Sequence, residues 1–108
     1  MSTMICDSSA AVLTDDGIAE RLARLRGWSH NENWIEKTYR FKNFLRAMSF
    51  VNALAFLAES VNHHPDLMIH YNEVTVRNWT HVAGGVTEHD FSLAEKIDQL
   101  VRESESSP

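Results

Sequence analysis

Two of the six histidines in this 108-residue chain are adjacent, in the segment Glu59-Ser-Val-Asn62-His63-His64-Pro65. Imidazole can donate or accept a proton near neutral pH, which suits it to acid–base chemistry. Pro65 disfavours helical geometry at His64, so we expect a helix to end here and to turn both imidazoles outward. Backbone carbonyls at a helix C-terminus favour imidazolium, which would suit His63 to proton donation.

The histidine pair also permits two other interpretations. His63 and His64 could be solvent-exposed residues that only end the helix. They could instead join His81 on a zinc ion, with Glu59 or water as the fourth ligand, although adjacent histidines converge poorly on one ion. A nucleophilic triad has less support, because no serine lies in a nucleophile-elbow motif and Cys6 lies in an N-terminal segment expected to be loose.

The remaining residues with chemical potential carry weaker signals. Trp28 and Trp79 could stack on a planar heterocycle, but sheet tryptophans more often pack in a core or an interface. Gly84-Gly85 predicts a flexible turn. The other histidines are interpreted as surface or locally hydrogen-bonded residues: His30, His70 and His89.

Charge and composition exclude several classes of protein. Ten Lys plus Arg against fifteen Asp plus Glu give a net charge of -5, so we expect no direct nucleic-acid partner. The content of 44% hydrophobic and 23% charged residues predicts one globular domain over residues 1–108, with flexible ends at 1–13 and 103–108. The longest uncharged run, residues 47–58, is too short for a membrane span. The single cysteine and the lack of a readable signal peptide predict a cytoplasmic protein.

The first half of the chain predicts a helix, a strand pair and a longer helix. Thr14 should cap a helix over residues 15–26, which Gly27 would stop. Period-two alternation predicts a strand over residues 34–41, with a short partner at 28–30 across a turn at 31–33. Asn43 should cap a helix over residues 44–61.

The apolar residues of the 44–61 helix cover more than one face. Its predicted buried stripe comprises Phe44, Met48, Val51, Leu54, Ala55, Ala58 and Val61. Four apolar residues lie partly outside that stripe: Leu45, Phe50, Phe56 and Leu57. Phe50 and Leu57 are seven residues apart and share one line of the helix surface. We expect this second face to bury against another copy of the chain in a homo-oligomer.

The second half predicts a hairpin and a final helix. Strands over residues 67–71 and 73–81 should pair through Asn72, with Val74 and Val76 on one face and His81 on the other. A pair resembling a capping box, Thr87 and Asp90, should begin a helix over residues 88–102. The order α-β-β-α-β-β-α predicts an α+β fold, a four-stranded antiparallel sheet with helices packed on one face.

Several separated motifs agree in order and spacing with one family. They are Gly27-Trp28, Phe41-Lys42-Asn43-Phe44, Glu59-x3-His63-His64-Pro65-x5-Tyr71-Asn72-x-Val74-x-Val76, Thr80-His81 and Gly85-Val86-Thr87-x2-Asp90-Phe91-x-Leu93-Ala94. Together they span roughly residues 14–100, and the chain resembles the pterin-4a-carbinolamine dehydratase family.

The resemblance implies a lyase that removes water from 4a-hydroxytetrahydropterin and yields quinonoid dihydropterin. Aromatic amino acid hydroxylases produce this carbinolamine, so the implied role is tetrahydropterin recycling. The family fold is a four-stranded antiparallel sheet with helices on one face, assembled as homodimers or homotetramers. The resemblance implies no metal and no other cofactor.

The resemblance also assigns roles by position. His63 and His81 match the family's acid–base histidines, and His64 matches a histidine that mainly holds substrate. The matched substrate-contacting or neighbouring positions are Glu59, Asn62, Trp79, Thr80, Val82 and Asp90. Asn62 stands where the family often has Asp, and Leu67 stands where it often has Trp, which leaves one aromatic wall of the pocket in question.

The reaction fits these residue types, because the leaving oxygen must gain a proton while the pterin ring system loses one, and imidazole can do both. A different class of function is a non-catalytic protein of the same fold that stabilises a partner's oligomer. Such relatives can dispense with the histidines. Retention of His63, His64 and His81 therefore favours the enzyme.

Overall fold

The structure is a computed structural model that describes residues 11–106, with side chains as far as Glu103. The elements are α1 (Asp15–Leu22), β1 (Ser29–Asn31), β2 (Trp34–Arg40), α2 (Phe44–Val61), β3 (Asp66–His70), β4 (Glu73–Asn78) and α3 (Glu88–Ser106). This is the predicted element order. Cys6 and the outer parts of both predicted flexible ends lie outside the described residues.

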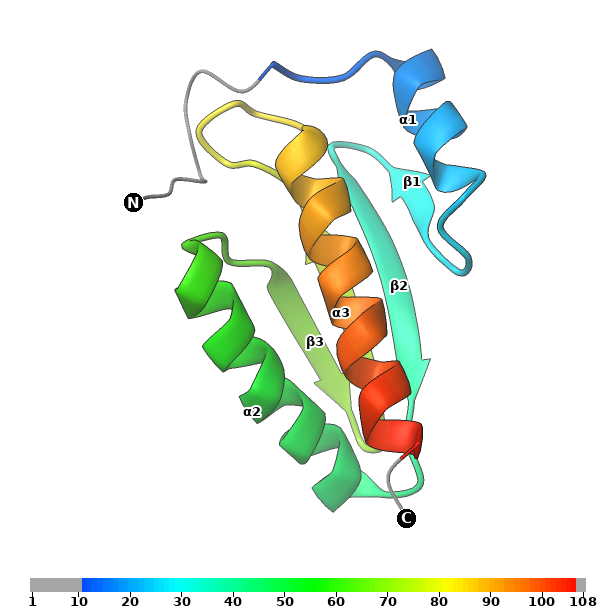
Figure 1. Ribbon diagram of the computed structural model, residues 1–108, viewed down its shortest axis with the longest axis vertical. Coiled ribbons are helices and arrows are strands. Elements are labelled where there is room, and N and C mark those ends of the chain that lie inside the picture. The colour runs from blue at the N-terminus through cyan, green and yellow to red at the C-terminus, as the bar shows by residue number, and fades with distance from the viewer. Residues whose placement is uncertain (1–10, 107–108) are drawn as a thin grey trace.

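The four strands form one antiparallel sheet in the order β1-β2-β4-β3. Helices α2 and α3 lie side by side on one face of this sheet, and α1 lies near β1 (Figure 1). The α+β fold predicted from the sequence is confirmed. Side chains of the opposite face, such as Thr38 and Arg40, are exposed.

The core fills the space between the sheet and the helices. Alternate residues of the central strands point into it, since successive side chains of a strand face opposite sides. Val74 and Val76 share the buried face, as predicted. The buried apolar residues are Ile18, Leu25, Trp28, Ile35, Tyr39, Ala47, Phe50, Leu54, Ala58, Val74, Val76, Val86, Phe91, Leu93, Ala94 and Ile97.

The predicted end of the first helix is wrong by one turn. Thr14 caps α1 by accepting the N–H of Gly17, as predicted, but α1 ends at Leu22 rather than at residue 26. The chain then forms a tighter turn of the 3₁₀ type, in which the N–H of Leu25 donates to the carbonyl of Leu22, three residues back. This turn places Leu25 in the core before Gly27 reverses the chain with a φ of 89°.

The structure describes part of each predicted flexible end, residues 11–13 and 103–106. The N–H of Leu13 donates to the carbonyl of Val86 at 2.8 Å, which fastens the segment before α1 to the loop before α3. Helix α3 continues to Ser106, beyond the predicted end at residue 102.

The buried face of α2 differs from the predicted stripe. Asn43 caps the helix through the N–H of Arg46, as predicted, but Ala47, Phe50, Leu54 and Ala58 are its buried residues. Phe44 and Ala55, placed in the buried stripe by the prediction, are exposed, and Phe50 and Leu57 pack on the core of this same chain. Packing against the sheet sets the rotation of the helix, which periodicity leaves undecided.

Helix α2 is long and apolar enough to cross a membrane by length and composition, with a mean hydropathy of 1.3 over its 18 residues. Core helices of soluble proteins have the same properties. Here four residues of α2 are buried against the sheet and α3, so the helix is part of the globular core.

Candidate active site

A left-handed cap ends α2 directly before the two adjacent histidines. Asn62, with a φ of 53°, ends the helix, and the N–H of His63 donates to the carbonyl of Ala58 at 3.1 Å. The predicted end of the helix is therefore confirmed. His63 turns into the protein and His64 turns to solvent.

His63 is buried, with 2% of its surface exposed, and its Nε2 lies 2.6 Å from Oδ1 of Asp90. The interpretation of both histidines as exposed end-of-helix residues is wrong for His63. His64 is exposed, and its Nε2 lies 2.7 Å from Oε2 of Glu59, one turn back on α2. Each histidine thus has its own carboxylate.

Asp90 joins the ends of three elements. It lies in the first turn of α3, where its Oδ2 accepts the N–H of Thr87 at 2.8 Å and the hydroxyl of Thr80 at 2.9 Å. The hydroxyls of Thr80 and Thr87 lie 2.8 Å apart, and the hydroxyl of Thr87 accepts the N–H of His89. The predicted capping pair is present, and its carboxylate also holds His63.

The hydrogen-bond network indicates which nitrogen of His63 carries a proton. Because Asp90 already accepts two donors through Oδ2, its Oδ1 acts as the acceptor for an Nε2–H of His63. In the neutral ring the lone pair then lies on Nδ1, which is buried and has no hydrogen-bond partner among the described residues. Nδ1 is therefore the nitrogen available to exchange a proton.

His81 lies in the turn after β4, because β4 ends at Asn78 rather than at residue 81. The backbone of Thr80 pairs with Gly85, and Gly84 closes the turn with a φ of 78°. The prediction that placed His81 on a sheet face is thus wrong. The glycine pair forms the predicted turn.

His81 is exposed and packs edge-on against Trp79, with ring centroids 4.3 Å apart. The indole Nε1–H of Trp79 donates to Oδ2 of Asp66 at 2.9 Å, which fixes the orientation of the indole ring. His81 directly follows Thr80, whose hydroxyl contacts the same carboxylate as His63. One carboxylate thus connects the buried histidine with the loop that carries the exposed one.

Two predicted substrate-contacting residues lie apart from this network. Asn62 is exposed beside His63, and the side chain of Val82 is 61% exposed in the turn. Three residues of the site were not singled out from the sequence as site residues. Asp66 accepts the indole N–H of Trp79. Asp90 is supported by two residues: Thr87 donates its backbone N–H to the carboxylate, and Asn78 donates its side-chain amide to the carbonyl.

The sequence contains patterns that could have identified two of these residues, Thr87 and Asn78, as part of the site. Thr87 belongs to the recognised capping pair. Asn78 continues the alternation of Val74 and Val76, and a polar residue in phase with buried valines indicates a buried hydrogen bond.

A cavity of about 120 Å³ adjoins His63, between the end of α2 and the first turns of α3, and His89 and Lys96 line it. In the part of the chain that the structure describes, no group of three or more His, Cys, Asp or Glu side chains could hold a metal ion. His63 and His64 turn towards different carboxylates, so the zinc set considered from the sequence does not assemble.

Comparisons with known proteins identify the family of this chain. A family model described as pterin 4 alpha carbinolamine dehydratase matches residues 11–100. A protein from Sulfurisphaera tokodaii, provisionally named as a pterin-4-alpha-carbinolamine dehydratase, is 48% identical to this chain. The match covers 82% of this chain and 96% of that protein. Another, from Picosynechococcus, is 48% identical over 84% of this chain and 99% of its own length.

Solved structures share the fold. A crystal structure described as a transcriptional coactivator/pterin dehydratase from Brucella melitensis has a TM-score of 0.78 and 35% identity, covering 82% of this chain and 97% of that one. A pterin dehydratase-like protein described as a RuBisCO assembly factor of the alpha-carboxysome has a TM-score of 0.56 at 22% identity, over 68% and 84% of the two chains, and shows the fold alone. By its matching family model and its relatives, this chain belongs to the pterin-4a-carbinolamine dehydratase family.

Proposed function

We propose that this protein is a hydro-lyase that dehydrates 4a-hydroxytetrahydropterin to quinonoid dihydropterin. Family membership supports the reaction class. The observation that carries the proposal in this chain is the Asp90 carboxylate, which contacts His63 and the residue preceding His81. One buried carboxylate thereby holds the His63 imidazole and anchors the start of the turn that carries His81.

The reaction requires one proton to arrive and one to leave. His81, at the surface, donates a proton to the hydroxyl on C4a, the C–O bond breaks, and water departs. His63 accepts the proton that a ring nitrogen of the pterin loses, through Nδ1, and Asp90 stabilises the resulting imidazolium. Because Nδ1 is covered in the free protein, this transfer requires the segments around His63 to open when substrate binds.

The neighbouring residues are proposed to hold the substrate. His64, with Glu59, provides an exposed polar pair at the end of α2, and Trp79 offers an indole ring beside His81. Asn62 and Val82, both exposed, complete the residues proposed to contact substrate, whereas the buried Thr80 and Asp90 are proposed to position His63 and the turn that carries His81. Leu67, in β3, is half-buried and supplies an aliphatic surface where the family often has an aromatic one.

The experiment is an assay of carbinolamine dehydration with purified protein, corrected for the non-enzymatic reaction. We expect acceleration above the uncatalysed rate that saturates with substrate. A rate equal to the buffer control at every protein concentration would contradict the proposal. In cells we place the protein in the cytoplasm, recycling tetrahydropterin for an aromatic amino acid hydroxylase.

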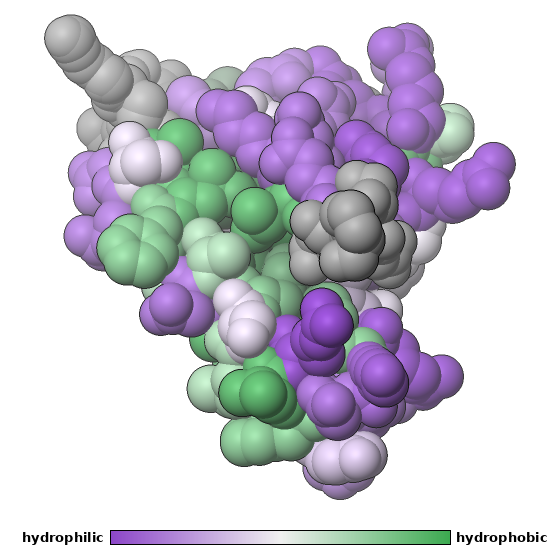
Figure 2. Space-filling view, turned by 60° about the horizontal axis from the view of Figure 1, so that its bottom comes forward, coloured by the Kyte–Doolittle hydropathy of each residue, from purple (hydrophilic) through white to green (hydrophobic). Residues whose placement is uncertain are grey.

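We further propose that the protein assembles into homodimers or homotetramers through the exposed side of α2. Figure 2 shows hydrophobic side chains gathered on one side of the molecule. Leu45 and Phe56 of α2 are 74% and 73% exposed, and Met68 and Ile69 of the edge strand β3 are more than 40% exposed. Contiguous apolar surface of this kind marks interaction sites.

The same surface supports the second candidate function, a non-catalytic protein that stabilises a partner's oligomer. The enzyme remains the preferred proposal, because an assembly role gives no reason for a buried His63–Asp90 pair. Dehydration by the purified chain decides between the two.

A further inference from the structure

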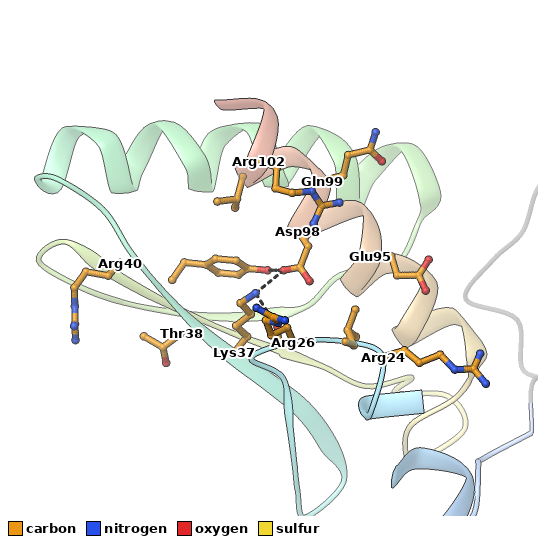
Figure 3. Close-up of a pocket in the computed structure, with 12 residues that line it drawn as sticks. Arg24, Arg26, Lys37, Thr38, Arg40, Glu95, Asp98, Gln99 and Arg102 are labelled. Carbon is orange, nitrogen blue, oxygen red and sulfur yellow. Dashed lines mark hydrogen bonds and ion pairs between the residues drawn. The ribbon is translucent and has the colours of Figure 1, made fainter. Parts of the chain in front are cut away.

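A cavity of about 730 Å³ lies beside the C-terminal half of α3, away from the histidine site. Asp98, in its wall, follows Asp90 by eight residues, or about 12 Å along the helix. The cavity is bounded by α3, by strand β2 and by the segment that follows α1 (Figure 3).

The cavity runs along an unpaired strand edge. Lys37, Thr38, Tyr39 and Arg40 are consecutive in β2 and all line it, although alternate residues of a strand face opposite sides of the sheet. A space that meets both sets of side chains must lie along the edge of the strand. The pairing explains why this edge is open: β1 pairs with β2 only from Trp34 to Glu36.

The open edge offers backbone hydrogen-bonding groups. Asn31 and Trp34 close a two-residue hairpin loop and form a hydrogen-bonded pair, and the pattern repeats at every second residue of an antiparallel strand. In this register Thr38 and Arg40 direct their N–H and C=O groups to the open edge. No described strand pairs with them on that side.

Positive charge is concentrated around this edge. Five of the ten Lys and Arg residues line the cavity, against two carboxylates, in a chain whose net charge is -5. The five are Arg24, Arg26, Lys37, Arg40 and Arg102. Lys37 pairs with Asp98, and Arg40 pairs with Glu73. Arg24, Arg26 and Arg102 form no ion pair with the described carboxylates.

The inner wall is held by a buried network centred on Asp98. Its carboxylate accepts the Tyr39 hydroxyl, the indole N–H of Trp28 at 3.1 Å and the ammonium of Lys37 at 2.9 Å. Lys37 also donates to the carbonyl of Arg26. These bonds fix the segment carrying Arg26 against the strand, so the cavity is preformed.

We infer that this cavity binds an acidic peptide segment in extended conformation, which pairs with the open edge of β2 as an added strand. Strand addition obtains affinity from backbone hydrogen bonds, here at Thr38 and Arg40. The basic side chains are spread along the edge, with Arg24 and Arg40 on opposite sides of the group in Figure 3. A line of charge suits an extended acidic chain better than a compact anion.

Charge argues against a second copy of this chain as the occupant. Pairing β2 with β2 would bring each basic cluster against its own image, and like charges across a strand pair are unfavourable. A simpler role for the arginines is to prevent aggregation at an exposed edge. That role predicts no affinity for an acidic strand, so a binding measurement with such a strand distinguishes edge protection from peptide recognition.

The test uses fluorescence anisotropy of a labelled hexapeptide of alternating Glu and Val with blocked ends. We expect saturable binding that weakens with salt, and no binding of the matching Lys–Val peptide. The double substitution Arg24→Gln/Arg26→Gln should weaken binding about three- to tenfold, the scale of losing two exposed charge pairs. The control Lys42→Gln/Arg46→Gln removes the same charge outside the cavity and should change binding less than about twofold.

Two further measurements isolate strand pairing. Hydrogen exchange at the Thr38 and Arg40 amides should slow on peptide binding, and N-methylation of the peptide backbone should abolish binding. Equal affinity for the methylated peptide, or its full displacement by inorganic tripolyphosphate with no amide protection, would overturn the inference in favour of a simple anion site. Absence of binding would leave the arginines as edge protection only. Each outcome is independent of dehydratase activity.

Discussion

At the scale of single residues, Asp90 performs two tasks that usually fall to different side chains. It caps α3 through Thr87, and it holds Nε2 of a buried histidine. Removing the carboxylate would therefore loosen both the helix end and the imidazole. This coupling makes conservative substitutions at the histidines more informative than removal of Asp90.

Replacing either proposed acid–base histidine should slow dehydration by roughly 10²- to 10⁴-fold, the usual scale for one general acid or base. The substitutions are His81→Gln and His63→Gln, measured at saturating substrate with the uncatalysed rate subtracted. Gln at position 63 can still donate to Asp90, whereas His63→Ala would leave a buried carboxylate without one partner, at about 1–3 kcal/mol. The burial of His63 is the reason that alanine at this position would also destabilise the fold.

Exposed His70 provides the matched control, since His70→Gln should leave the rate unchanged. Parent rates in both site variants, with the fold intact by circular dichroism, would remove His63 and His81 from the mechanism.

Metal removal is expected to leave activity intact. The proposed reaction uses imidazole protons alone, so exhaustive chelation followed by elemental analysis should yield metal-free protein with the parent rate. A stoichiometric zinc ion whose removal abolished turnover would reinstate the metal interpretation of His63, His64 and His81.

Tyr39 should make stability fall at alkaline pH. Burial and the hydrogen bond to Asp98 raise the pKa of its hydroxyl above the ordinary value near 10. The unfolded chain therefore loses this proton near pH 10 while the folded chain keeps it, so the contribution is complete below pH 10 and is lost as pH rises further.

Urea unfolding of the parent and Tyr39→Phe tests this expectation. The parent should be more stable by about 1–3 kcal/mol at pH 8, because the variant leaves Asp98 without one donor. The difference in free energy of unfolding between the parent and the variant should narrow above pH 10. Tyr71→Phe, at an exposed position, should show no such change, and a constant gap for Tyr39→Phe would contradict the argument.

At the scale of elements, α2 depends on a local cap. Asn43 accepts the N–H of Arg46 through its side chain, so Asn43→Ala should lower the free energy of unfolding by about 1 kcal/mol. Asn52→Ala, at an exposed position inside the same helix, should not destabilise, because alanine favours helix interiors. Equal effects of the two substitutions in thermal unfolding would show that the cap contributes nothing.

At the scale of the whole molecule, the exposed side of α2 should carry the subunit interface. Leu45 and Phe56 are eleven residues apart, close to three turns, and therefore lie on one line of the helix. Glu at both positions would place charges in an apolar interface, which is unfavourable without partners. Analytical ultracentrifugation should show a shift towards monomer with the fold retained.

The interface positions predicted from the sequence, Phe50 and Leu57, provide the comparison for this double substitution. Glu at those positions should unfold the chain rather than only dissociate it, because both side chains pack on its own core. A Leu45→Glu/Phe56→Glu protein as associated as the parent would place the interface elsewhere, and a monomeric parent at high concentration would exclude self-association.

The sequence by itself determined the type and order of the elements. Alternation in residues 34–40 and 73–78, the caps at Thr14 and Asn43, and the capping pair of Thr87 and Asp90 depend on residues close in the chain. Such local preferences act before any packing partner is present. The effect of Pro65 on the residue before it is also local, and it predicted the end of α2 at Val61.

Only the tertiary structure decided which side chains are buried and where edges remain open. It turned α2 so that Phe50 faces the core, and it buried His63 against a carboxylate 27 residues away in the chain. It also set the register of β1 one residue later than predicted, at Ser29–Asn31, so that the strand pairs with β2 only from Trp34 to Glu36 and leaves the rest of that edge unpaired. These outcomes depend on contacts between distant segments, and the rotation of a helix or the length of a strand pair is set by the neighbour it packs against.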